Sequence, residues 1–122
     1  MTPKARERRF SRLKFMGCIA CWTEGTMANA EIHHLNLGGH AGQKRRGDEF
    51  TIPLCRWHHQ GHVEAGHTAT SMREVRGPSL ARHSKKFREK YGKDDALLAK
   101  VNDLLRQMDE ADAFRTEAQE SQ

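Results

Sequence analysis

Two short stretches decide the fold of this chain: "CIAC" at residues 18–21 and "CRWHH" at residues 55–59. A Cys-x-x-Cys pair and a Cys-x-x-His pair that lie far apart in the sequence can together close a tetrahedral zinc site. The sequence therefore predicts a structural Zn²⁺ ion held by Cys18, Cys21, Cys55 and His58. His62 is an alternative fourth ligand, because the longer spacing from Cys55 to His62 can also close such a site.

The composition supports a small domain that needs such an ion. The 122 residues are 36% hydrophobic and 30% charged, which leaves little material for a large core, and a bound zinc ion often compensates for that shortage. Three cysteines are an odd number, so a disulfide framework fits poorly and a reducing, cytoplasmic compartment is expected. No apolar run is long enough to span a membrane, and no secretory segment follows the basic start.

Histidines exceed the needs of one zinc ion. His33 and His34 form a bare pair, and the remaining candidates follow the third cysteine: His59, His62 and His67. This surplus suggests a second, open site for a divalent ion, Mg²⁺, Mn²⁺ or Zn²⁺. A neutral imidazole can also serve as a general base at neutral pH. Adjacent residues on a strand face opposite sides, so His33 and His34 are expected to have different roles.

The charge of the chain points to a polyanion. The net charge is +5, and residues 1–15 carry six Lys and Arg side chains against one acid, whereas from Asp94 onward eight acidic residues oppose three basic ones. A basic body with an acidic end favours a nucleic-acid partner bound away from the C-terminus. The predicted phosphate contacts are Lys44, Arg45 and Arg46 in a loop, and Arg8, Arg9 and Arg12 near the N-terminus.

The pattern along the chain predicts an α+β fold. Residues 1–16 form a basic N-terminal arm or helix, and residues 17–92 form the main domain. Within it we expect strands at 30–35 and 50–54 around a glycine-rich basic loop at 38–47, then helices at 56–64 and 79–91. We therefore expect a ββα-metal core, in which a strand, a loop, a second strand and a helix follow one another and histidines lie on the first strand and on the helix. A structural zinc would stabilise this core, and further helices would flank it. A C-terminal helix at 93–110 precedes a polar acidic tail at 111–122, which is expected to be frayed or disordered.

These residues resemble a known family. "CIAC", "AEIHHLNLGGHAGQK", "GDEFTIPLCRWHHQGH" and His67 are similar to the HNH (His-Me finger) endonuclease superfamily, most closely to the phage recombination-enhancement (Ref) group of RecA-dependent nucleases. The resemblance implies a structural zinc at the four zinc ligands predicted above, His34 as general base, and His33 and His59 as ligands of the catalytic metal. The middle asparagine of HNH is absent, and Phe50 stands near its place. Asp48 is the nearest polar residue that could orient the base or assist the metal.

The sequence therefore favours a metal-dependent DNA endonuclease that hydrolyses phosphodiester bonds in a bacterial host cell. The resemblance adds a RecA-type recombinase filament as a possible partner. The main alternative is a zinc-stabilised nucleic-acid-binding module without catalysis. A third is an interaction domain that docks through the apolar stripe between Leu97 and Met108. The form of the DNA, the identity of the catalytic metal and the oligomeric state stay open at this point.

Overall fold

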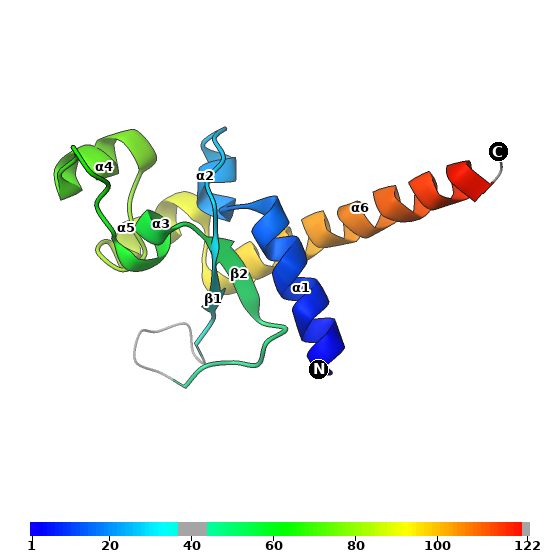
Figure 1. Cartoon of the computed structure of the whole chain (residues 1–122). Coiled ribbons are helices and arrows are strands. Elements are labelled where there is room, and N and C mark those ends of the chain that lie inside the picture. The colour runs from blue at the N-terminus through cyan, green and yellow to red at the C-terminus, as the bar shows by residue number, and fades with distance from the viewer. Residues whose placement is uncertain (37–43, 121–122) are drawn as a thin grey trace.

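The computed structural model describes residues 1–36 and 44–120 and has an α+β fold built around a two-stranded antiparallel sheet (Figure 1). Strand β1 (Glu31–His34) pairs with β2 (Thr51–Leu54) in a register that runs from Glu31 opposite Leu54 to His34 opposite Thr51. The helices are α1 (Pro3–Met16), α2 (Ile19–Thr23), α3 (Arg56–Gln60), α4 (Ala69–Arg76), α5 (Ser84–Tyr91) and α6 (Asp94–Glu120).

The core lies where the helices meet β2. All four residues of β2 are buried, whereas those of β1 are half-buried, because α1, α2, α3 and α6 all contact the second strand. Fully buried side chains come from the main domain and from the helices on either side of it, and they include Leu13, Ile52, Leu54, Trp57, Phe87 and Val101. Burial of these apolar groups drives the packing of short helices that would not be stable alone.

The N-terminal segment, predicted as an arm or a helix, forms helix α1, which packs against the two strands. Thr2 caps its start by accepting a hydrogen bond from the Ala5 backbone N–H at 3.1 Å, and Gly17 ends it with a left-handed φ of 81°. A side chain at position 17 would meet the Ala28 carbonyl oxygen at 3.0 Å. Glycine is therefore required where α1 turns into the first cysteine pair.

Helix α3 is shorter than predicted. The sequence favoured a helix from residue 56 to 64, but α3 ends at Gln60 because Gly61 adopts a left-handed φ of 72° and caps the helix. The chain from His62 to His67 is therefore not helical, and His62 does not share a helical face with His59. The helix predicted at 79–91 is also shorter and begins at Ser84.

The C-terminal tail is helical rather than frayed. Helix α6 continues to Glu120, and its outer part extends away from the other elements (Figure 1). The polar composition predicted disorder, but ion pairs stabilise this helix. Arg12 of α1 pairs with Asp112 at 2.7 Å, and within α6 Arg106 pairs with Asp103 and Glu110, each one turn away. Ion pairs at this spacing support an exposed helix. Among the described residues, no helix combines the length and the apolar composition needed to cross a membrane.

Replacing Leu13 by alanine should destabilise the fold by about 2–5 kcal/mol, because it leaves a cavity beneath α1 where the side chain is fully buried. Phe15→Ala on the same helix is the matched control, since that ring is 81% exposed. It should change stability by no more than about 0.5 kcal/mol. Urea unfolding of the zinc-loaded chain measures both, and equal effects would contradict this packing of α1.

Candidate metal centre and histidine site

Each pair of predicted zinc ligands lies at the start of a short helix. Cys18 caps α2, and its Sγ accepts a hydrogen bond from the Cys21 backbone N–H at 3.4 Å. Cys55 caps α3 in the same way, with its Sγ 3.5 Å from the His58 backbone N–H. The x-x spacing therefore places both side chains of a pair on the first turn of one helix, where a backbone N–H donates to the sulfur of the capping cysteine.

The fold brings the two pairs together. The Nδ1 atom of His58 lies 3.5 Å from the sulfurs of Cys18 and Cys21 and 3.3 Å from that of Cys55. The sulfurs of Cys21 and Cys55 are 3.9 Å apart, and all four side chains are buried. A tetrahedral Zn²⁺ ion with bonds of about 2.0–2.3 Å holds its ligand atoms roughly 3.3–3.8 Å apart. The four side chains can therefore hold a metal ion, consistent with a structural zinc.

Neighbouring groups select the ligand atom of His58. Its Nε2 lies 2.8 Å from the carbonyl oxygen of Arg76, which can only accept, so Nε2 carries the proton and Nδ1 faces the sulfurs. Burial alone would lower the pKa of His58, but hydrogen bonds to Cys21 and Cys55 raise it to about 9. Hydrogen bonds from Cys18 and Cys21 likewise lower the pKa of Cys55. Hydrogen bonds to Cys21 and Cys55, together with burial, raise the pKa of Cys18. Without metal the cluster therefore pairs a Cys55 thiolate with a protonated His58, and a divalent cation would displace the protons of its ligands.

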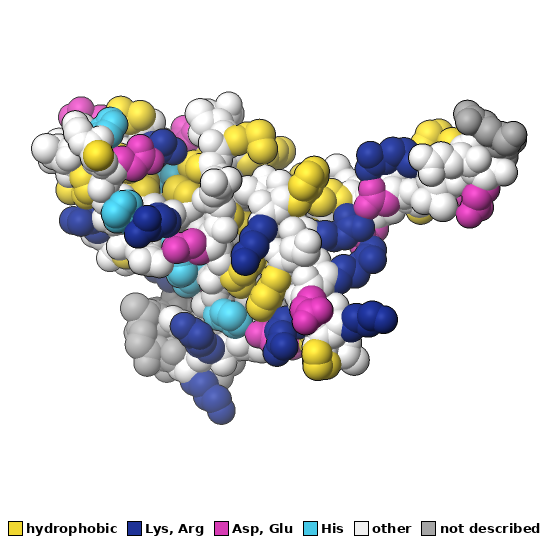
Figure 2. All heavy atoms as spheres, in the orientation of Figure 1, with side chains coloured by type: hydrophobic (Ala, Val, Ile, Leu, Met, Phe, Trp, Pro, Cys, Tyr) yellow, Lys and Arg dark blue, Asp and Glu magenta, His cyan; other side chains and the backbone are white. Residues whose placement is uncertain are grey.

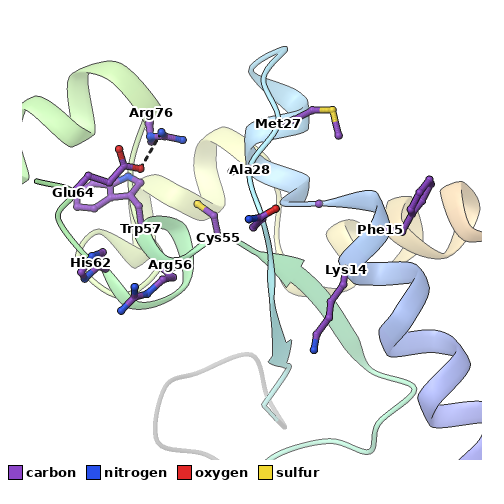
Figure 3. Close-up of a pocket in the computed structure, with 12 residues that line it drawn as sticks. Lys14, Phe15, Met27, Ala28, Cys55, Arg56, Trp57, His62, Glu64 and Arg76 are labelled. Atoms are coloured by element: carbon purple, nitrogen blue, oxygen red, sulfur yellow. Dashed lines mark ion pairs between the residues drawn. The ribbon is translucent and has the colours of Figure 1, made fainter.

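His62, the alternative fourth ligand, lies outside this cluster. It is exposed and lines a hollow of about 560 Å³ between α3 and the end of α1 (Figure 3). Arg56 lies beside it, Glu64 pairs with Arg76 at 2.9 Å, and Lys14 reaches in from α1. Of the two histidines proposed for the zinc, the structure brings His58 to the three sulfurs.

A second group of polar side chains joins β1 to α3. The rings of His33 and His59 meet edge to face with centroids 4.9 Å apart. Burial lowers the pKa of His33 to about 4, with further lowering by the charges of His59 and His34, so the His33 ring is neutral at neutral pH. An imidazole binds a divalent ion through the lone pair of an unprotonated ring nitrogen, which a neutral His33 can offer. Among the described residues, however, only the cysteine cluster gathers three or more ligand groups.

His34 has different partners, as the strand alternation predicted. Its Nε2 lies 2.9 Å from Oδ1 of Asp48, and its ring meets Phe10 of α1 edge to face at 6.0 Å. Arg6 lies 3.9 Å from the other oxygen of Asp48. The register of β1 and β2 is regular from Glu31 to His34. His33 thus joins His59 and His34 joins Asp48, with no bulge to bring both imidazoles to one point.

Sequence reasoning missed Glu31. Its Oε1 lies 3.1 Å from Nδ1 of His59 and 2.7 Å from Nε2 of Gln60. Glu31 and His33 are two residues apart on one strand and so share a side, which was the signal available in the sequence. Glu31 and Gln60 both lie within the quoted motif stretches, but neither was predicted to have a role. His67, predicted to complete the open site, instead lies 3.1 Å from the Ser71 hydroxyl at the start of α4.

The predicted phosphate-binding residues fall into two groups. Arg8 and Arg12 pair with Asp109 of α6, and Arg9 bonds to Thr51 and Asn102. These arginines hold α1 against its neighbours. Lys44 and Arg45 are exposed, whereas Arg46 pairs with Asp95 and stacks on Phe50 at 3.9 Å. Figure 2 shows histidines and cations over the face that carries α3 and the strands. Residues 37–43, most of the predicted glycine-rich loop, lie outside the described residues.

His58→Ala should remove the bound zinc and destabilise the fold, because three thiolates would lose the fourth ligand that closes the site. His62→Ala should keep one zinc ion per chain and an unchanged melting temperature. Metal content by atomic absorption and unfolding by circular dichroism test both variants. Zinc retained by His58→Ala and lost by His62→Ala would reverse the assignment of the fourth ligand.

Comparison with known proteins gives a match to a family model. A family model described as recombination enhancement, RecA-dependent nuclease matches residues 3–106, which include the cysteine cluster, both strands and most of the described helices. No solved structure matches the chain. The match extends beyond the motifs, which run from Cys18 to His67, and takes in α1 and the first half of α6. The chain belongs to the recombination enhancement, RecA-dependent nuclease family.

Proposed function

We propose that this protein is a metal-dependent DNA endonuclease of the HNH type, in which His34 is the general base. The observation that carries the proposal is the contact between His34 and Asp48 at 2.9 Å, next along β1 from the neutral His33 ring that meets His59. Phosphodiester hydrolysis needs a base for water and a positive charge at the phosphate. His34, on one side of β1, would be the base. His33, on the other side, would help to hold the metal ion that supplies the positive charge.

The contact with Asp48 suits His34 to act as a base. A carboxylate can only accept a hydrogen bond, so Nε2 of His34 carries the proton and Nδ1 is the basic atom of the ring. The same carboxylate stabilises the imidazolium that forms when Nδ1 takes a proton from water, as the acidic member of a catalytic triad does. Asp48 thus orients the base, which is one of the two roles considered for it from the sequence.

His33 and His59 would hold the catalytic metal. Both rings are half-buried and come from different elements, β1 and α3, so the cluster of thiols and His58 that anchors α3 also determines their separation. A divalent ion bound there supplies positive charge to the scissile phosphate and to the leaving oxygen. Two protein ligands leave further coordination positions for phosphate and water.

Substrate binding would rely on cations near this strand. Lys44 and Arg45 are exposed beyond the end of β1, where Asn36 bridges to Arg45. Contacts of this kind supply affinity for any DNA sequence. The family description adds dependence on RecA, and we propose that a RecA filament presents the DNA to the His34 side of the protein.

His34→Ala should lower the rate of plasmid nicking by about 100- to 10,000-fold, because it removes the group that takes the proton from water. The assay uses supercoiled plasmid with Mg²⁺ or Mn²⁺, with and without a RecA filament. The variant should keep its zinc, since His34 lies outside the cysteine cluster. Undiminished nicking would exclude His34 as the base. DNA binding without cleavage by the native chain, under every condition, would instead favour a non-catalytic zinc-stabilised module.

Replacing both Lys44 and Arg45 by alanine should weaken DNA binding and reduce the slope of log K against log salt by about 1–2, because up to two phosphate contacts are lost. The control is Arg106→Ala with Arg115→Ala, which removes the same charge from α6, where both arginines pair with acids of their own helix. Fluorescence anisotropy across a salt series measures the slopes. Equal slopes for the two double variants would place the phosphate contacts elsewhere.

A further inference from the structure

We infer that Glu31 is a positioning residue that holds the His59 ring with Nδ1 protonated, so that Nε2 offers its lone pair to a metal ion. This inference rests on the proposed role of His59 as a metal ligand. No role for Glu31 was predicted from the sequence, and Glu31 lies outside the cysteine cluster. Its place in β1 and its two hydrogen bonds to α3 carry the argument.

The proton on His59 follows from the partners of one oxygen atom. Oε1 of Glu31 lies 2.7 Å from Nε2 of Gln60, an amide nitrogen that can only donate, so this oxygen is an acceptor. The same oxygen lies 3.1 Å from Nδ1 of His59. Because a carboxylate has no proton to give, Nδ1 must be the donor. In a neutral imidazole the other nitrogen, Nε2, then has the free lone pair that metal binding requires.

The position of Glu31 is itself determined by the fold. Glu31 is the first residue of β1 and pairs with Leu54, the last residue of β2, immediately before the zinc ligand Cys55. His59 and Gln60 are consecutive in α3, so both hydrogen bonds join the strand to the end of one short helix. Glu31 also shares a strand side with His33, whose ring meets His59. One carboxylate thus fixes the His59 ring beside His33.

Partners of this kind change metal affinity without touching the metal. A carboxylate that accepts from the second nitrogen of a ligating histidine fixes the tautomer and increases the basicity of the ligating nitrogen, and its removal typically lowers affinity about 10- to 100-fold. Glu31 meets that description in its contact with His59. Direct ligation by Glu31 is a different role, and the experiment below separates the two.

The first measurement is the tautomer of His59 in the full-length, zinc-loaded chain without a second metal. Long-range ¹H–¹⁵N spectra of the ¹⁵N-histidine-labelled protein should show the proton on Nδ1 of His59. Glu31→Ala should shift the ring toward the Nε2–H form, and Glu31→Gln, whose amide oxygen can still accept, should restore part of the native signal. Glu64→Gln is the control, because Glu64 is another partly exposed carboxylate and pairs with Arg76. It should leave His59 unchanged.

The second measurement is Mn²⁺ binding by calorimetry to the same zinc-loaded chains. Glu31→Ala should weaken binding by about 10- to 100-fold, Glu31→Gln by less, and His59→Ala should abolish it. A native His59 protonated on Nε2, or a Glu31→Ala variant with native tautomer and affinity, would overturn the inference. So would loss of Mn²⁺ binding in Glu31→Ala with an unchanged tautomer, which would make Glu31 a direct ligand. Failure of the native chain to bind Mn²⁺ would count instead against the proposed metal site.

Discussion

The convergence of three buried thiols on one imidazole nitrogen is the constraint on which the rest of the structure depends. Cys18 and Cys21 begin α2, Cys55 follows β2 and His58 lies in α3, so the cluster joins three short elements. A small domain with little core gains most from such a link. It also determines where α3 lies against β1, and therefore how far His59 is from His33.

The sheet divides the remaining histidines between two environments. Because β1 pairs with β2 in regular register, its side chains alternate, and the neighbouring His33 and His34 point to different partners. His33 lies against α3 in a setting that keeps its ring neutral, whereas His34 lies between Asp48 and Phe10 of α1. This division is a difficulty if both imidazoles must share one task. It becomes an advantage if one holds a metal ion and the other accepts a proton.

Charge pairing between the ends of the chain has a structural role here. The basic residues of α1 were candidates for phosphate contacts, but three of them face α6 or β2, where Asp109, Asp112, Asn102 and Thr51 meet them. Exposed ion pairs contribute little individually. Together they explain why a polar segment continues as helix beyond the apolar stripe. Arg12 is largely covered by its acidic partners, whereas Arg8, Lys44 and Arg45 stay exposed.

Local chemistry was readable from the sequence, and long-range geometry was not. The cysteine pairs, the two strands and the separate surroundings of His33 and His34 follow from spacing and alternation, because residues two or three apart are placed by one helical turn or one strand pleat. The end of α3 at Gly61, the choice of His58 over His62 and the contact of Glu31 with His59 were decided only in the folded chain. Each depends on a backbone angle or on atoms from distant elements, which no periodicity within one segment can specify.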